Sequence, residues 1–445
     1  MEEKYDIEES LVFIKEKKNI CLQFPDELLS DAPYVAKRLQ SDINSVYIMA
    51  DTTFGPCCTD LIAGQHANAD AIIHYGPACL TRPAENSPPI LYVFEKQEID
   101  SDDLIIKIEG SVTEDVPVIV MGDTSTYYLW PKLQSRLTGS KYIWSHIEQQ
   151  VDSPASLKES IHGRCIQLPE HVQLQDCCLL YIGSDSLCLS NLVMAIRPSS
   201  VVVYDPTTKS INQNYGQLQS VLQRRFVQME KARDANVIGI VVGTLGVASY
   251  LSVVNTLKEL IIASGKKPYV LAVGKPNPAK LGNFPEIECF VLVACPQNSI
   301  LDSKEYYHPI VTPYELSLAL EKNSIWNPLD YQLNLGRMVD GLSSQLEKTK
   351  LRAIEGHESD DEPHFSLITG QYAVKKGFVT VTNENIPGEF MMIKKEGGQI
   401  SKFVTSNVGA EFLSSRSFQG LEPKIGESEV KLAEEGRSGI AKNYN

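Results

Sequence analysis

Short runs of β-branched and aliphatic residues alternate along the chain with amphipathic stretches. Parallel sheets with helical crossovers show this alternation, because their strands are buried on both faces. We expect strands over residues 19–24, 45–50, 71–74, 90–94, 117–123, 178–183, 201–205, 237–242, 269–273 and 290–294. We expect helices over residues 25–39, 59–67 and 218–235. The pattern therefore predicts an α/β fold.

The same rhythm of strand, glycine or proline turn, helix and strand occurs three times. Such internal repetition predicts related structural units. We expect three parallel-sheet α/β domains, 1–100, 101–215 and 216–327, and a C-terminal extension over 328–445 that is partly flexible. An acidic stretch in this extension, residues 355–363, is typical of a solvated loop.

Composition and charge narrow the class of protein. The chain has 445 residues, of which 43% are hydrophobic, and a formal net charge of −15. This charge argues against direct binding to nucleic acid or to an acidic membrane surface. The acidic N-terminal segment lacks the apolar core of a secretory signal, and no apolar run has the length to span a bilayer. We therefore expect a cytoplasmic protein that does not bind membranes.

Four of the ten cysteines share a position, because each follows a predicted strand in a turn that contains glycine or proline. They are Cys57, Cys58, Cys79 and Cys295. The carboxyl ends of parallel strands form the ligand-binding edge of a sheet, so thiols from distant parts of the sequence can converge there. Converging thiolates favour a soft metal ion or an iron–sulfur cluster.

Other candidate residues have simpler interpretations. Cysteines within apolar runs, or beside them, are expected to be structural: Cys21, Cys177, Cys178, Cys188 and Cys289. His74 is expected to be a hydrogen-bonded structural histidine. Residues 243–246, Gly-Thr-Leu-Gly, are expected to form a strand–helix turn, with an anion cradle as the alternative. No Cys-x-x-Cys pair occurs, which argues against a zinc ribbon or a dithiol redox motif.

Taken together, several blocks resemble the diphthamide synthase family. They are residues 22–29, 50–60, 74–80, 204–206, 232–235, 242–246, 293–296 and 312–315. The resemblance implies three domains with a pseudo-threefold arrangement around a central cleft, where cysteines hold a 4Fe-4S cluster. It also implies radical chemistry in which S-adenosylmethionine is cleaved. The 3-amino-3-carboxypropyl group is then transferred to a histidine of elongation factor 2, the first step of diphthamide biosynthesis.

Two departures distinguish this chain from the family's catalytic chain. Val247 and Gln297 stand where that chain has arginines. The resemblance therefore implies an accessory iron–sulfur subunit of a heterodimer, whose partner is the catalytic subunit and binds S-adenosylmethionine. A small metalloprotein is implied as electron donor, for reduction of the catalytic subunit's cluster. The alternatives are a self-sufficient homodimeric synthase and a structural scaffold without a cluster.

The implied metal ligands are Cys57 or Cys58, together with Cys79 and Cys295. Adjacent residues in the first turn of a helix point about 100° apart, so we expect one of Cys57 and Cys58 to bind. Whether Cys165 contributes a ligand from the middle domain is left open. No residue of this chain is assigned as catalytic or as binding S-adenosylmethionine.

Overall fold

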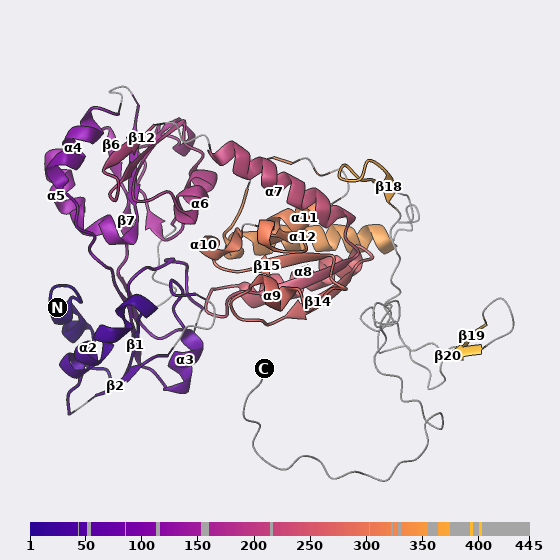
Figure 1. The fold of residues 1–445 in the computed structure, drawn as a ribbon, viewed down its shortest axis with the longest axis horizontal. Helices are drawn as coiled ribbons and strands as arrows, with labels where there is room; N and C mark the ends of the chain where they lie inside the picture. Colours follow the sequence, from indigo (N-terminus) through magenta and orange to yellow (C-terminus); the bar gives the residue numbers. More distant parts are fainter. Residues whose placement is uncertain are drawn as a thin grey trace, which may run out of the picture. The chain divides into compact units, whose positions relative to one another are not determined.

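The computed structural model describes residues 1–42, 44–50, 55–84, 86–112, 116–152, 160–213, 217–301, 303–321, 324, 326–327, 331–354, 364–373, 392–394 and 400–402. Helices cover three largely parallel sheets, which confirms the predicted α/β class (Figure 1). One compact unit comprises Met1–Thr380, and a second comprises Val381–Asn445. Within the second unit, the described residues form the hairpin of β19 (Met392–Lys394) and β20 (Ile400–Lys402).

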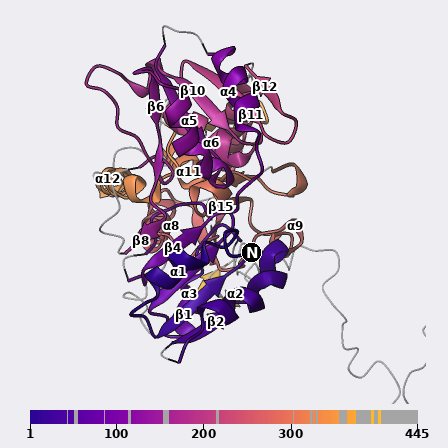
Figure 2. The same cartoon turned by 90° about the vertical axis from the view of Figure 1, so that its left-hand side faces the viewer.

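The first sheet has the strand order β2-β1-β3-β4-β8. Its strands are β1 (Asn19–Gln23), β2 (Ser45–Ile48), β3 (Ala71–Tyr75), β4 (Ile90–Val93) and the antiparallel β8 (Gln150–Val151). Its helices are α1 (Ile7–Phe13), η1 (Asp26–Asp31), α2 (Ala32–Leu39) and α3 (Leu61–His66), which Figure 2 shows around the strands. All residues of β3 and β4 are buried, as the continuous apolar runs predicted.

The second sheet has the strand order β12-β11-β10-β5-β6. Its strands are β5 (Val118–Gly122), β6 (Tyr142–Trp144), β10 (Cys178–Ile182), β11 (Ser200–Asp205) and the antiparallel β12 (Ser210–Asn212). Its helices are α4 (Ser101–Glu109), η2 (Thr124–Leu129), α5 (Trp130–Arg136), η4 (Leu174–Asp176) and α6 (Leu187–Ile196). A separate short pair consists of β7 (His146–Ile147) and β9 (Arg164–Cys165).

The third sheet has the strand order β14-β13-β15-β16. Its strands are β13 (Val237–Val242), β14 (Lys267–Leu271), β15 (Cys289–Val293) and β16 (Ile310–Val311). Its helices are α7 (Gln217–Asp234), α8 (Tyr250–Ala263), α9 (Pro278–Leu281), α10 (Pro296–Ser299), η5 (Ser303–Glu305), α11 (Pro313–Leu320) and α12 (Leu335–Ile354). Apolar residues of α7, α8, α11 and α12 pack with β13 and β15 in one core. A hairpin of β17 (His364–Phe365) and β18 (Tyr372–Ala373) follows.

A buried ion pair fixes helices to the third sheet. Arg225 of α7 donates from Nε to Glu315 Oε1 of α11 over 2.6 Å, and from Nη2 to the Ile310 carbonyl over 3.0 Å. The Tyr331 hydroxyl also donates to Glu315 Oε1, over 2.7 Å. Because Arg225 and Glu315 are almost fully buried, each depends on the other for compensation of its charge.

Several expectations about local structure can be compared with these elements. Burial of Cys21, Cys177, Cys178 and Cys289 confirms that they are core residues. The expected helix over 25–39 is divided into η1 and α2, and β14 lies two residues earlier than expected. The acidic stretch 355–363 lies outside the described residues. The domain boundaries stay a prediction. Strand β8 belongs to the expected middle domain by its residue numbers, but it pairs with β4 of the first sheet.

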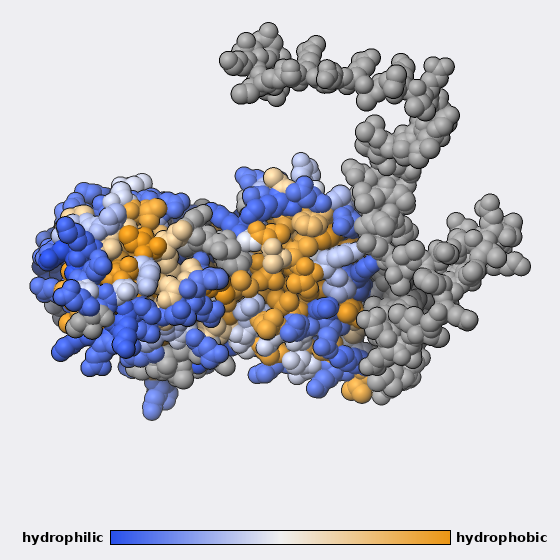
Figure 3. Space-filling view, turned by 90° about the horizontal axis from the view of Figure 1, so that it is seen from below, coloured by the Kyte–Doolittle hydropathy of each residue, from blue (hydrophilic) through white to orange (hydrophobic). Residues whose placement is uncertain are grey.

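The surface adds two observations. In the described part of the chain, no helix has both the length and the apolar character needed to cross a bilayer. Figure 3 shows apolar side chains gathered on one face of the part of the molecule that carries the third sheet. Val270 of the edge strand β14 is among the exposed large hydrophobic residues.

Candidate metal centre

Four cysteine side chains meet where loops of the first and third sheets lie together. The sulfur atoms of Cys57, Cys58, Cys79 and Cys295, here called the cysteine group, all lie within 4.8 Å of one another. Cys58 Sγ is 3.8 Å from Cys79 Sγ and 3.4 Å from Cys295 Sγ. The predicted convergence of thiols from distant parts of the sequence is therefore confirmed.

Cys57 and Cys58 lie in a turn between β2 and α3. The turn is held by Gln23 at the end of β1, whose Nε2 donates to the Cys58 carbonyl over 2.8 Å. Gln23 Oε1 accepts the backbone N–H of Asp60 over 2.9 Å. Since α3 begins only at Leu61, the expectation that the two cysteines occupy the first turn of a helix is wrong. The turn instead lets both sulfurs join the cysteine group.

Cys79 lies in the loop that follows β3. Gly76 in this loop has φ +92°, and a Cβ atom there would lie 2.9 Å from Pro25 Cγ, so only glycine fits without strain. His74 is fully buried, and its Nε2 lies 2.9 Å from the Pro77 carbonyl, which confirms a hydrogen-bonded structural histidine. The backbone N–H of Cys79 donates to the Cys57 carbonyl over 2.9 Å. This bond joins the two cysteine loops of the first sheet.

Cys295 lies between β15 and the short helix α10. The Ser299 hydroxyl donates to the Cys295 carbonyl over 2.9 Å, and the backbone N–H of Asn298 donates to the same carbonyl, also over 2.9 Å. The side-chain Nδ2 of Asn298 lies 3.4 Å from Cys295 Sγ and 3.5 Å from Cys57 Sγ. Asn298 was not among the site residues predicted from the sequence. Its position three residues after a cysteine at the start of a helix was the available signal, because such residues share a helix face.

Backbone hydrogen bonds join the first sheet to the third beside the cysteine group. The N–H of Ala84 donates to the Gly246 carbonyl, and the N–H of Ala248 donates to the Arg82 carbonyl, both over 3.0 Å. A Cβ atom at Gly246 would lie 2.9 Å from the Thr59 carbonyl oxygen. Gly246 therefore contacts the first sheet's loops, and residues 243–246 do not open a helix, because α8 begins at Tyr250.

The thiols of the cysteine group influence one another's protonation. Cys58, Cys79 and Cys295 are buried, whereas Cys57 is partly buried. A hydrogen bond with Cys295, followed by those with Cys57 and Cys58, holds the pKa of Cys79 well below its ordinary value. The bond with Cys295 raises the pKa of Cys58, and the bond with Cys57 raises that of Cys295. The pKa values of these three buried thiols thus depend on one another, and a bound metal would replace their protons.

The donor set fits a thiophilic metal centre. Four thiolates suit a single zinc ion or an iron–sulfur cluster. A tetrahedral zinc ion with Zn–S bonds of about 2.3 Å has sulfur–sulfur distances of about 3.8 Å. The separations of Cys58 Sγ from Cys295 Sγ and from Cys79 Sγ, 3.4 and 3.8 Å, are close to that value. The four-thiol donor set therefore suits either kind of centre, and the sulfur separations match a single ion.

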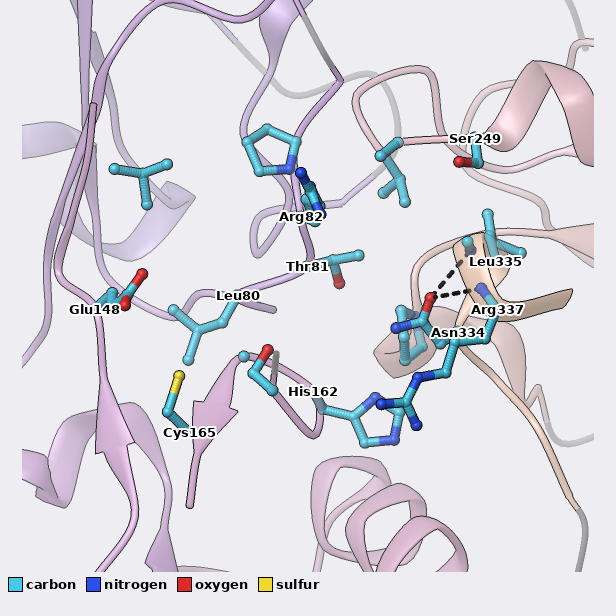
Figure 4. A pocket seen from close by; sticks show the side chains of 18 of the residues that line it. Leu80, Thr81, Arg82, Glu148, His162, Cys165, Ser249, Asn334, Leu335 and Arg337 are labelled. Atoms are coloured by element: carbon cyan, nitrogen blue, oxygen red, sulfur yellow. Dashed lines mark hydrogen bonds between the residues drawn. The ribbon is translucent and has the colours of Figure 1, made fainter. Parts of the chain in front are cut away.

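Cys165 does not belong to the cysteine group. It lies in β9 and lines a cavity of about 500 Å³. The same cavity is lined by Leu80, labelled in Figure 4, and by Pro296; these residues directly follow Cys79 and Cys295 in the sequence. Cys165, from the expected middle domain, thus faces a cavity beside the cysteine group, but its sulfur lies outside the group.

Charged and polar side chains also line this cavity. Figure 4 shows His162 and Arg337 beside each other, away from Glu148 and Cys165. Burial, followed by the positive charges of Arg164 and Arg337, lowers the pKa of His162 to about 4. The imidazole is therefore neutral at physiological pH.

A second cavity, of about 400 Å³, is lined by Asn298, Asp123, Arg164 and Cys188, among other residues. Arg164 is almost fully buried, and its Nη2 donates to the Gly122 carbonyl over 2.8 Å. The same nitrogen lies 3.6 Å from Cys188 Sγ. Cys188 is thus a neighbour of a buried guanidinium, apart from the cysteine group.

The fold and the site together define an α/β protein whose strand-end loops assemble a buried thiol centre. A family model described as "Putative diphthamide synthesis protein" matches residues 24–332. The chain belongs to this family, which confirms the resemblance identified in the sequence.

Individual relatives agree with this assignment, and one solved structure is similar in fold. A protein of Schizosaccharomyces pombe named 2-(3-amino-3-carboxypropyl)histidine synthase subunit 2 is 39% identical over 99% of this chain and 90% of its own length. A Gallus gallus protein of the same name is 35% identical over 100% of this chain and 92% of its own length. The crystal structure of Dph2 from Pyrococcus horikoshii with a 4Fe-4S cluster is similar in fold, with a TM-score of 0.56. It is 21% identical and covers 73% of this chain and 93% of its own.

Proposed function

We propose that this chain is the accessory iron–sulfur subunit of a two-chain transferase. The enzyme transfers a 3-amino-3-carboxypropyl group from S-adenosylmethionine to a histidine of elongation factor 2, in the first step of diphthamide biosynthesis. Relatives of nearly full-length similarity carry the name of that synthase's subunit 2. The observation that carries the proposal is the cysteine group, in which four sulfurs lie within 4.8 Å of one another.

Three cysteines are the proposed ligands: Cys79, Cys295, and either Cys57 or Cys58. A 4Fe-4S cluster supplies one-electron transfer when it is bound. The chain's own contribution is to position the sulfurs and to limit their contact with water. Gln23 holds the turn of Cys57 and Cys58, and the N–H of Cys79 ties this turn to the next loop.

The accessory role rests on two positions near the site. Val247 and Gln297 occupy the positions where the family's catalytic chain is expected to carry arginines. Val247 is buried and pairs with Pro83 of the first sheet's loop, so it has a packing role here. We infer that S-adenosylmethionine is cleaved by a partner subunit of the same family, in the cytoplasm. This chain would supply electrons that a small metalloprotein delivers.

The sulfur distances favour a second candidate, a structural zinc site in a scaffold subunit. The test is to purify the full chain without oxygen, reconstitute it with iron and sulfide, and measure iron, sulfide and zinc. An iron–sulfur subunit will hold iron and sulfide in equal amounts and give an electron paramagnetic resonance signal after reduction. Zinc without sulfide, in a chain that still supports its partner, would establish the scaffold. Transfer activity by the purified chain alone would instead establish a self-sufficient homodimer.

A further inference from the structure

We propose that Asn298 raises the reduction potential of an iron–sulfur cluster held by the cysteine group, by donating hydrogen bonds to two of its sulfurs. This inference rests on the proposed function, because it requires a cluster at these cysteines. It assigns Asn298 a positioning and tuning role, without contact to a substrate.

The contacts of the Asn298 side chain identify the two sulfurs. Its Nδ2 lies 3.5 Å from Cys57 Sγ and 3.4 Å from Cys295 Sγ. A side-chain amide carries two N–H donors on this nitrogen, so one group can serve both sulfurs. The two cysteines come from the first and third sheets. The amide therefore spans the junction on which the site depends.

The position of the amide is fixed from both sides. The backbone N–H of Asn298 donates to the Cys295 carbonyl over 2.9 Å, which holds the residue in α10. Opposite the side chain, a Cβ atom at Gly55 would lie 3.2 Å from Asn298 Nδ2. Gly55 therefore leaves room for the amide where a larger residue would press against it.

Asn298 also lies between sulfur and a cavity. It is half-buried and lines the cavity of about 400 Å³, while Cys295 is fully buried. Hydrogen bonds in such partly dehydrated surroundings are stronger than in water. The amide thus presents fixed donors to the sulfurs on the side from which water could otherwise reach them.

Reduction of the cluster by one electron increases the negative charge on the cluster and its thiolate ligands. A donor aimed at a ligand sulfur stabilises this reduced form more than the oxidised form, and so raises the potential. Asn298 aims donors at Cys295, a proposed ligand, and at Cys57, one of the two alternatives for a further ligand. In the described part of the chain, its neighbour Gln297 makes no side-chain hydrogen bond to a sulfur of the group, although both residues are half-buried. Gln297 is therefore a matched control.

The experiment is a redox titration of the full-length chain after anaerobic reconstitution, with dithionite as the electron source and electron paramagnetic resonance as the readout. Asn298→Leu removes both donors at similar volume. We expect the equilibrium constant for one-electron reduction to fall about tenfold, which is a shift of about 59 mV to lower potential. Asn298→Asp keeps the shape but adds negative charge, so it is expected to shift the potential further. Gln297→Leu is expected to titrate like the unmodified chain.

Each other result has a definite meaning. If loaded Asn298→Leu and Asn298→Asp titrate like Gln297→Leu, the inference is overturned and the proposed function stands. If both Asn298 variants fail to hold iron and sulfide while Gln297→Leu holds them, Asn298 serves assembly of the site, and the tuning role is overturned. An unmodified chain that holds no iron and sulfide overturns the proposed function and this inference together.

Discussion

The loops after β3 and β15 carry cysteine side chains, whereas charged side chains lie in the corresponding region of the second sheet. Cys79 and Cys295 lie in the cysteine group. In the second sheet, Asp123 follows β5 and accepts hydrogen bonds from the Tyr181 hydroxyl and from the backbone N–H of Ser184. Arg164 is buried nearby, with carbonyl groups as its main acceptors.

This difference shows how one architecture can support different chemistry at its strand ends. All three sheets have parallel strands whose carboxyl ends are followed by loops. Among the described residues, the cysteine group takes its sulfurs from loops of the first and third sheets, which share backbone hydrogen bonds beside it. Asp123 is half-buried, and burial raises the pKa of its carboxyl group. Burial alone therefore does not create a metal centre.

The largest expected effect comes from replacing a cysteine of the group, either in the loop after β3 or in the loop after β15. Cys79→Ala and Cys295→Ala should each weaken metal binding by more than about 100-fold, since even residues that only support ligands contribute 10–100-fold. Cys165→Ala is the matched control from the middle region and should keep its metal. Iron, sulfide and zinc analysis after gel filtration provides the measurement. Equal loading of all three variants would refute the ligand assignment.

Breaking the buried ion pair beside the third sheet should cost more unfolding free energy than breaking an exposed ion pair beside the second sheet. Arg225→Met leaves the Glu315 carboxylate buried without its partner, which costs about 3–5 kcal/mol of unfolding free energy. Arg136 and Asp102 form an exposed pair at 3.5 Å, so Arg136→Met should cost at most about 1 kcal/mol. Urea unfolding measures both. Similar losses in the two variants would contradict this ranking.

The Gln23 amide should contribute more to stability than the exposed Gln40, which follows α2 beside the first sheet. Gln23→Ala leaves the Cys58 carbonyl and the Asp60 N–H without their partner, at a cost of about 1–3 kcal/mol. Gln40→Ala alters an exposed side chain and should stay within about 0.5 kcal/mol. Thermal unfolding and metal retention are the readouts. An unchanged midpoint in Gln23→Ala would show that the turn does not depend on this amide.

Acid should lower the unfolding free energy of the chain through protonation of His162. Its pKa is about 4 in the folded chain against an ordinary value of 6.5, so the unfolded chain binds more protons between these values. The stability that His162 contributes is therefore present above pH 6.5 and is lost as the pH falls toward 4. The unfolding free energy should change with pH by at most about 1.4 kcal/mol per pH unit through this group. His162→Asn should flatten this dependence in urea unfolding at several pH values, and an unchanged slope would contradict it.

Much of the fold follows from the sequence, because strands buried on both faces read as continuous apolar runs. The edge strand β14 was displaced in the prediction because Lys267 and Pro268 do not resemble a buried strand. An edge strand tolerates proline, since one side of it needs no hydrogen-bond donor. The start of α8 at Tyr250 was also missed. There, the preceding loop is occupied by hydrogen bonds to Arg82 and Ala84, which no local pattern reveals.

The candidate site was predictable as far as cysteine type and strand-end position allow. Cys57 and Cys58 were expected to diverge on a helix, but the turn held by Gln23 brings both sulfurs into the group. Gln23 is 1% exposed, and its role depends on a backbone carbonyl 35 residues away. Such a contact is determined by the tertiary fold, and the sequence alone contains no sign of it.

The separation of Cys58 and Cys295 by 237 positions has a consequence for biosynthesis. A ribosome that adds about 5–20 residues per second needs about 12–47 s to make the chain between them. Throughout that interval Cys57, Cys58 and Cys79 are present without the Cys295 thiol. A metal that binds the whole cysteine group can therefore do so only after Cys295 has been synthesised, and a nascent chain that stalls earlier cannot complete the group.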